Sequence, residues 1–544
     1  MRANLPTLVH SDGFTPLRSD VPHMRRDARI GDSNWPIASR SRSMRDWRPS
    51  YGSADADNNG EVDIAAARGR DLERNEARVF SGIQQQVQAI VGSGLQVVPK
   101  PDYVTLGKDK AWADKWSRIV RNKFKSWSNT TDCDASRTET LGFMMAEMLT
   151  SVLVSGSGLL IPYYLPGNGL TQYGTAFRVV EADRLCNPNF CADRDDLRRG
   201  IHIDPETGAP LGYYICSRHP GDWLGVLASG VPRKWTYIPA FTSWGRRRVI
   251  HVFPRRRPEQ STGISALAGV ADKIRDIGKI TRAELRNQVV TAALALIVES
   301  NLQPEQVLQM FKSSPDYGYL QMYFDEEFRP GVTDDGATIV APPGTKVSPL
   351  QSNRNAQNFD SMLRTSWREV MTGMGVPYEI GARDFGGLNY SNARTIITDA
   401  WQDFYTRRTW VGFRAYDPVF QTWFEEAVHL GEIPDCTPEE FYRPGAAAAY
   451  TAAEWLGDGP AWIDMLKEAQ AQTTKMANMT TTMEQEWAKV GRHWQEEAEQ
   501  QEVEAEFYAA RKRPYPLDVA ARHAVTGGSQ NGVRANDDTT DRER

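Results

Sequence analysis

A polar, glycine-rich segment precedes a helix-forming stretch in RDFGGLNYSNARTIITDAWQDFYTRRTW, residues 383–410. Its uncharged side chains can form hydrogen bonds, and its adjacent glycines allow backbone conformations closed to other residues. Such a segment could close over an active site as a lid, or it could contact a ligand that moves past it. The candidate contact residues are Gly386, Gly387, Leu388, Asn389, Tyr390, Ser391 and Asn392. In the helix that follows, Tyr405, Arg407, Arg408 and Trp410 are interpreted as packing anchors.

A second candidate site is a basic helix face further towards the amino terminus. It consists of Arg275, Lys279, Arg282 and Arg286, at steps of 4, 3 and 4 residues. That spacing places all four on one side of a helix, where they could pair with acids of a neighbouring subunit or line a channel. Pairing between subunits is favoured. The arginine runs at 246–248 and 255–257 are interpreted as a solvated or inter-subunit surface in preference to a DNA contact.

Several motifs resemble chemical sites but lack an essential part. DADNNGEVD has the spacing of a calcium loop, but Ala66 stands where the twelfth position needs a bidentate acid. Cys186 and Cys191 lack further zinc ligands nearby and are predicted to be buried thiols. SGSGLL lacks the lysine of a phosphate loop, and the DFG triplet at 384–386 lacks the other kinase motifs. The sequence therefore predicts no catalytic residues, no metal and no cofactor.

Length and charge limit the function classes. With 544 residues the chain is too long for one ordinary core and suggests two to four domains. Its 64 basic and 69 acidic residues give a net charge of -5, so any DNA contact should be local or weak. No run of 18 apolar residues predicts a membrane span, and the amino terminus lacks an apolar signal core. Five cysteines without C-x-x-C spacing favour reduced thiols in a cytoplasm.

Hydrophobic periodicity predicts a mixed helix and strand chain. A polar arm occupies residues 1–60, and residues 176–253 are rich in predicted strands. Further strands are expected in LQVVPKP and GLLIPYYL. Helices are expected at 61–92, 109–128, 139–155, 263–290, 355–375, 391–429 and 445–510. A β-like insertion therefore separates two helices, as in a stalk with a tip.

An ordered set of segments resembles the lambda-type portal proteins of tailed phages, over roughly residues 50–505. The resemblance lies in RDLERNEARVFSGIQQQVQAIVGSGLQVVPKPD, GIHIDPETGAPLGYYI, PRKWTYIPA, VIHVFPRRRPEQSTGIS, VAPPGTKVSPLQSNRNAQNFDSMLRTSWREVMTGMGVPYEIGARDF and WLGDGPAWIDMLKEAQAQ, together with the loop and helix described first. It implies an α+β portal fold with a mixed α/β wing, a helical stem, a small clip that contains β-structure and a helical crown.

The resemblance assigns a range to each part. These are an arm at 1–60, the first part of the wing at 61–261, stem helices at 262–291 and 353–376, a clip at 292–352, a tunnel loop at 377–395, a helix returning to the wing at 396–439, a crown at 440–510 and a disordered tail at 511–544.

The resemblance also implies a function. About twelve copies would form a closed ring at one capsid vertex. That ring would be a conduit for double-stranded DNA during packaging and ejection, with residues 386–392 as a weak collar around the duplex. The implied partners are the terminase large subunit, the major capsid and scaffold proteins and a head–tail connector, with assembly in the host cytoplasm and no membrane contact. The alternative is a DNA-processing enzyme with residues 383–392 as its lid, which would need clustered acids or a nucleotide-binding motif.

Overall fold

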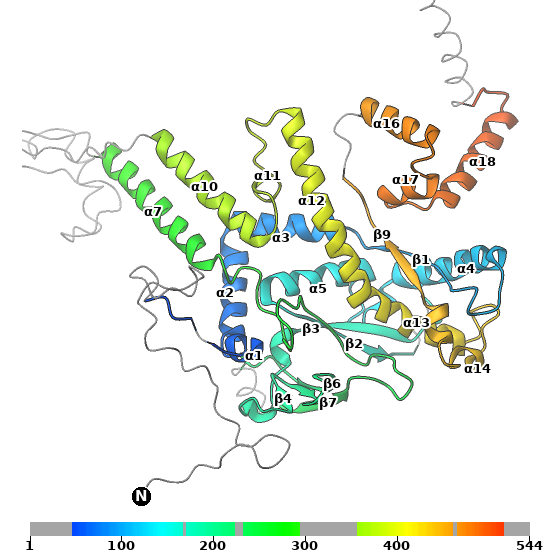
Figure 1. Cartoon of the computed structure of the whole chain (residues 1–544), viewed down its shortest axis with the longest axis horizontal. Helices are drawn as coiled ribbons and strands as arrows, with labels where there is room; N and C mark the ends of the chain where they lie inside the picture. The colour runs from blue at the N-terminus through cyan, green and yellow to red at the C-terminus, as the bar shows by residue number, and fades with distance from the viewer. Residues whose placement is uncertain are drawn as a thin grey trace, which may run out of the picture. The chain divides into compact units, whose positions relative to one another are not determined.

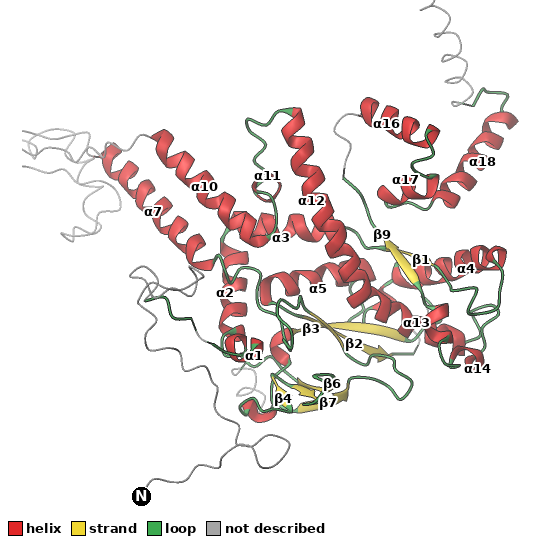
Figure 2. Cartoon of the chain, in the orientation of Figure 1, coloured by secondary structure: helices red, strands yellow, loops and turns green. Residues whose placement is uncertain are grey.

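The computed structural model describes residues 46–49, 51–166, 170–222, 232–293, 356–460 and 465–515. The chain divides into two compact units, 1–57 and 58–544. In the first unit the described residues include most of a short helix, α1 (Ala54–Asn58). Helices and strands are mixed throughout the second unit, which confirms the predicted combination of helix and sheet (Figure 2). The segment predicted as the clip lies almost entirely outside the described residues.

Among the described residues of the second unit, helices are the commonest regular structure (Figure 1). Their bounds are α2 Val62–Asn75, α3 Ala77–Ile90, α4 Lys110–Ser128, α5 Leu141–Ser155, α7 Ala271–Ala293, α10 Ala356–Met374, α11 Tyr378–Gly381, α12 Tyr390–Val411, α13 Asp417–His429, α14 Pro438–Phe441, α15 Ala446–Tyr450, α16 Met465–Ala477, α17 Met483–Lys489 and α18 Trp494–Ala510. A single π-helical turn, Gly412–Tyr416, joins α12 to α13 without a break in the helical run.

In the described part of the chain, three antiparallel sheets lie among these helices. Their strands are β1 Gln96–Pro99, β2 Gly158–Tyr164, β3 Thr175–Glu181, β4 Leu197–Arg198, β5 Ile201–Ile203, β6 Pro210–Cys216, β7 Trp235–Pro239, β8 Ile250–Val252 and β9 Ala453–Leu456. The strand orders are β1-β9, β3-β2-β8 and β4-β5-β6-β7. In the second sheet, Gly158 of β2 lies opposite both Glu181 of β3 and Val252 of β8, so these three residues form one row across the strands.

An aromatic cluster joins α4 to α13. Trp116 and Trp127 of α4 are fully buried, and so are Phe420 and Trp423 of α13. Phe124 stands nearly edge-on to Trp423, with ring centroids 5.1 Å apart and an interplanar angle of 78°. Such a pair contributes about 0.5–1.5 kcal/mol beyond its buried area. This cluster fixes the carboxyl-terminal continuation of α12.

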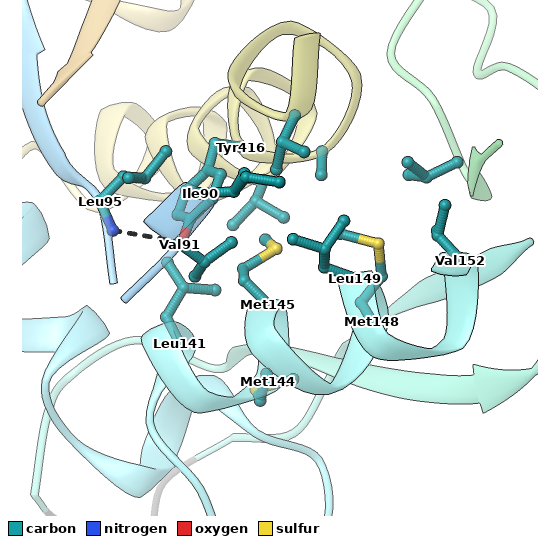
Figure 3. Packing of buried hydrophobic residues seen from close by; sticks show 14 of the residues in the cluster. Ile90, Val91, Leu95, Leu141, Met144, Met145, Met148, Leu149, Val152 and Tyr416 are labelled. Carbon is teal, nitrogen blue, oxygen red and sulfur yellow. Dashed lines mark hydrogen bonds between the residues drawn. The ribbon is translucent and has the colours of Figure 1, made fainter. Parts of the chain in front are cut away.

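A second part of the core is formed by α5, whose methionine-rich face packs against the end of α3 (Figure 3). Met145, Met148 and Leu149 are at most 2% exposed. Flexible thioether side chains can fill irregular gaps of this kind. Tyr416 reaches the same region, and its hydroxyl accepts a hydrogen bond from the Leu95 amide at 3.2 Å. The π-helical turn is therefore tied to the chain that follows α3.

The structure corrects three predicted elements. The helix expected at 61–92 is two helices, because Glu76 adopts an extended conformation between α2 and α3. The helix expected at 263–290 begins only at Ala271. A Cβ on Gly263 would lie 1.9 Å from the Gly156 carbonyl oxygen. This close approach of two segments of the chain holds the residues before Ala271 in a non-helical path. Within the mostly helical stretch 445–510, β9 pairs with β1, a partner more than 350 residues away in sequence.

Candidate functional site

The polar loop between α11 and α12 is held by internal hydrogen bonds at its start. The Tyr378 hydroxyl donates to a carboxylate oxygen of Asp384 at 2.9 Å, and the Gly386 amide donates to the other at 3.3 Å. These donors, Tyr378 first, lower the pKa of Asp384. Tyr378 itself is only 5% exposed, so it ties the loop to the core. After this tether the chain projects outwards, and Phe385 is 56% exposed.

The tip of the loop has the freedom that its glycines suggested. Gly387 has a φ of +79°, a conformation that residues with a side chain rarely adopt. A Cβ built on Gly387 would meet no atom within 4 Å, so the tip lies in open space. The flexible contact segment predicted here is therefore exposed, except that Leu388 is half-buried.

The loop is shorter than the range 377–395 assigned to it. Residues 378–381 form α11, and α12 already begins at Tyr390. Tyr390, Ser391 and Asn392 therefore lie in the first turn of a helix and not in a loop. Asn389 is its N-cap, because the side-chain oxygen accepts the Asn392 amide at 2.8 Å. Asparagine is among the preferred residues at an N-cap, because its side-chain oxygen accepts a hydrogen bond from an amide that has no partner within the helix.

Near its other end, α12 is anchored by Arg408. This side chain is 6% exposed and lies against the rings of Trp401 and Tyr405. Its guanidinium donates, at 2.6 to 3.1 Å, to the main-chain carbonyls of Ala89, Ile90, Gly457 and Asp458. Ala89 and Ile90 are the last residues of α3. The carbonyls at a helix C-terminus have no donors within the helix, and the helix dipole favours a cation there. The interpretation of Arg408 as a packing anchor is confirmed.

The neighbouring predicted anchors differ in burial. Arg407 donates to the side-chain oxygen of Gln86 in α3, and Trp410 packs against the core. Tyr405 is 36% exposed and so contributes only part of its surface. Together, Arg407 and Arg408 link α12 to α3, whose residues lie more than 300 positions earlier in the sequence. The loop is therefore held at both ends, by Tyr378 and by the second half of α12.

The basic face predicted on one helix is present on α7. Its residues Arg275, Lys279, Arg282 and Arg286 are all exposed. Lys279 pairs with Asp276 one turn away, at 2.9 Å, and the Arg282 guanidinium donates to the Gly278 carbonyl at 3.2 Å. Lys273, on the other side of α7, forms an ion pair with Glu369 of α10 and so joins the two helices. The basic face remains available to a neighbouring chain or to a ligand.

A cleft that sequence reasoning missed lies between β2, β7 and α13. It has a volume of about 640 Å³, and Tyr163, Tyr237 and His429 contribute to its lining. Glu425 within it forms an ion pair with Arg246 and accepts the Tyr442 hydroxyl at 2.7 Å. Glu426, also in the lining, accepts the Gly174 and Thr175 amides, so the two carboxylates of the cleft already have partners in the chain. Only tertiary contacts bring these distant residues together.

Cysteine and acidic side chains are among the groups of this chain that could bind a metal ion. Cys191 is exposed, which contradicts its prediction as a buried thiol, whereas Cys186 is half-buried and burial raises its pKa to about 11. Among the described residues, no group of three or more His, Cys, Asp or Glu side chains is placed to hold a metal ion. In the same part of the chain, no helix is long and apolar enough to cross a membrane.

Comparison with known proteins identifies the family. Residues 40–408 match the family described as phage portal protein, lambda family. The portal protein of Escherichia phage N15 is 28% identical, covering 98% of this chain and 99% of that protein. Portal protein B of Escherichia phage lambda is also 28% identical, covering 95% and 96%. The probable portal protein of Halomonas phage phiHAP-1 is 22% identical, covering 84% and 83%.

Solved structures include a similar chain in the neck of a native gene transfer agent particle computed with C12 symmetry. It is 14% identical, with a TM-score of 0.38, and the match covers 80% of this chain and 93% of that one. The family match spans more than half of the chain and runs from before α1 through the loop to Arg408. This chain therefore belongs to the lambda family of phage portal proteins.

Proposed function

We propose that about twelve copies of this chain form a ring at one capsid vertex and that double-stranded DNA passes through it during packaging and ejection. The observation that carries this function is the family match over residues 40–408. The portal proteins of phages N15 and lambda match almost their whole length to this chain, which supports the same role for the whole chain. Imaging and mass measurement of the purified protein test the ring, and a compact monomer under all assembly conditions would contradict it.

The loop 382–389 and the first turn of α12 are the proposed contact with DNA. The loop tip is exposed, and the side chains near it are uncharged hydrogen-bonding groups, which can contact phosphate and sugar without reading sequence. Each neutralised phosphate adds a salt-dependent contribution to affinity, so an uncharged collar holds DNA weakly and allows it to move. The tether at Tyr378 and the anchor at Arg408 keep the collar in place.

The DNA contact can be tested by adding charge without removing the helix cap. Replacing Ser391 and Asn392 with lysine leaves Asn389 and its side-chain acceptor in place. In a packaging reaction, this variant should retain or translocate DNA differently from the wild type, most strongly at low salt. The matched control replaces Gln402 and Thr406, exposed positions further along the same helix, with lysine. Equal packaging by all three proteins at every salt concentration would contradict a DNA contact at the loop.

We also propose that residues 292–352, which fall almost wholly outside the described residues, dock the terminase large subunit and later the head–tail connector. The resemblance to the family supports this assignment, and we expect the major capsid and scaffold proteins to surround the ring. Deleting residues 315–331 should leave the ring intact and abolish terminase docking. Normal packaging after this deletion would contradict the assignment.

The alternative function is a DNA-processing enzyme whose lid is residues 383–392. The geometry of Asp384 favours the portal, because both of its carboxylate oxygens accept hydrogen bonds that shape the loop. The matching family is a structural one. We expect the purified protein to show no ATPase or nuclease activity, and turnover lost on a point mutation in residues 383–392 would favour the enzyme.

A further inference from the structure

The β3-β2-β8 sheet carries unbalanced charges of opposite sign beside its two edge strands. The row Glu181, Gly158 and Val252 runs across the sheet from one edge to the other. Since neighbouring strands lie about 4.8 Å apart, the two edge strands are separated by about 10 Å. Basic side chains gather beyond the β8 edge, and acidic side chains gather beside the β3 edge.

The β8-edge basic cluster consists of Arg247, Arg255 and Arg414. Arg414 projects from the π-helical turn, and its guanidinium lies over the ring of Phe253, the residue after β8, at 6.0 Å from the ring centroid. Burial, and then the charges of Arg247 and Arg255, lower the pKa of Arg414. Within the part of the chain that the structure describes, none of the three arginines forms an ion pair. A half-buried cation beside two others needs an anion from elsewhere.

A buried imidazole lies beneath this cluster. His251 is 5% exposed, and its ring centroid is 4.6 Å from that of Phe253. Its Nε2 atom has no hydrogen-bond partner. An exposed aromatic side chain flanks the arginines: Phe241 is 41% exposed, and the Arg247 guanidinium lies over its ring at 5.5 Å from the centroid. Exposed aromatic residues beside arginines are typical of protein–protein interfaces.

The β3-edge acidic cluster consists of Glu139 and Glu147, both exposed. Glu147 lies on α5, which packs on this sheet through Met148 against Gly158. Burial, and then the charges of nearby Asp134, Glu139 and Glu181, raise the pKa of Glu147. No cation of the described residues contributes to that shift.

Two features make the acidic cluster suitable as an interface. Neither Glu139 nor Glu147 forms an ion pair among the described residues. Phe143, one helical turn before Glu147, is 56% exposed. The acidic cluster therefore has carboxylates that could serve as counter-ions for the arginines of the basic cluster, and it has an exposed aromatic ring beside them. Opposite charges with aromatic contacts between them are the pattern of complementary surfaces.

We propose that the β8-edge basic cluster of one copy contacts the β3-edge acidic cluster of the next copy. This contact presupposes the ring proposed above and assigns a specific surface to it. The two clusters are different patches of one chain, so the contact is head-to-tail, and repeated head-to-tail contacts close into a ring when the rotation allows. The partner is therefore a second copy of this chain, which carries the complementary charge.

Charge reversal tests this contact in the full-length chain. The first variant replaces Arg255 and Arg414 with glutamate, and the second replaces Glu139 and Glu147 with arginine. Each variant alone presents the same sign of charge at both surfaces, so assembly should require at least a tenfold higher protein concentration than the wild type, as measured by sedimentation. An equimolar mixture should assemble again, because opposite charges then face each other. A variant with all four reversals should assemble alone.

The mixture also separates interface loss from misfolding, because a misfolded chain is not rescued by a reversal on a different chain. As a matched control, Arg443 is replaced with glutamate, since it is exposed and its ion pair within the described residues is with nearby Glu440. This control should assemble like the wild type. Unchanged assembly of both reversal variants, or no recovery in the mixture, would overturn the contact while leaving the ring intact. A wild-type chain that forms no ring would instead refute the proposed function.

Discussion

Replacing Arg408 with methionine should lower the free energy of unfolding more than any change at the exposed surface of α12. Methionine keeps most of the length and apolar contact of the side chain but removes its donors. Four main-chain carbonyls lose the guanidinium, and two of them belong to the last residues of α3. These carbonyls lie in a region where water cannot readily replace the lost donor, because Arg408 is 6% exposed.

The magnitude follows from the number of hydrogen bonds. A typical hydrogen bond contributes about 1 kcal/mol net, and more when the donor is charged, so the loss is about 4 kcal/mol. Lysine at this position keeps the charge, but its single ammonium group lacks the fork of donors with which arginine reaches four carbonyls. We therefore expect the lysine variant to lose about half as much free energy of unfolding as the methionine variant. The charge alone is therefore not sufficient, and the planar geometry of arginine is needed.

Urea unfolding of the wild type and of both variants measures the difference, at one protein concentration because assembly affects stability. Replacing Arg394 with methionine is the control, since it removes an exposed arginine from the same helix. The control should change the free energy of unfolding by less than about 0.5 kcal/mol. If the Arg408 variant is destabilised no more than the Arg394 variant, the four hydrogen bonds do not anchor α12.

Three further outcomes are expected. Replacing Asn389 with alanine should destabilise the start of α12 by about 1 kcal/mol and speed amide exchange in its first turn, whereas aspartate should preserve both; equal exchange in the alanine variant would exclude a capping role. Burial lowers the pKa of His251 to about 3, so the unfolded chain binds its proton first and stability is lost as the pH falls below 6.5. The loss from this group should reach about 2 kcal/mol by pH 5, and replacing His251 with leucine should reduce the fall in urea midpoint over that range. A Cβ on Gly142 would lie 2.1 Å from the Ser93 carbonyl oxygen, so alanine there should cost about 1–3 kcal/mol, while alanine at Gly269, which has open space, should be tolerated.

Local sequence patterns were sufficient to predict a helix or strand whose own residues show the periodicity of that element. The predicted helix 109–128 begins one residue later as α4, with Asp109 as its N-cap accepting the Trp112 amide at 2.7 Å. Its apolar stripe at Trp116 and Trp127 faces the core, as helical spacing requires. The predicted ends of the strand in LQVVPKP and of the helix at 355–375 likewise differ from the observed ends of β1 and α10 by at most two residues. Periodicity is a local property, so it can be read without knowing the fold.

Patterns were misleading where distant chain segments decide the conformation. The sequence 61–92 has helical spacing throughout, yet Glu76 is extended, because α2 and α3 each pack on α5 in a different direction. The four-residue segment β9 lies among helices and becomes a strand because β1 pairs with it. No local pattern contains the position of that partner.

The candidate site was determined by sequence and tertiary structure together. The sequence alone indicated a glycine-hinged polar segment ahead of a helix with Arg408 as an anchor, because residue types and spacing carry that information. Only the tertiary structure decided that Asn389 caps α12 and that Tyr378 tethers Asp384. It also decided that Arg414 and Glu147 lie by opposite edges of one sheet, where neither forms an ion pair with another described residue. Charge balance depends on which side chains meet in space, and the order of residues along the chain does not state it.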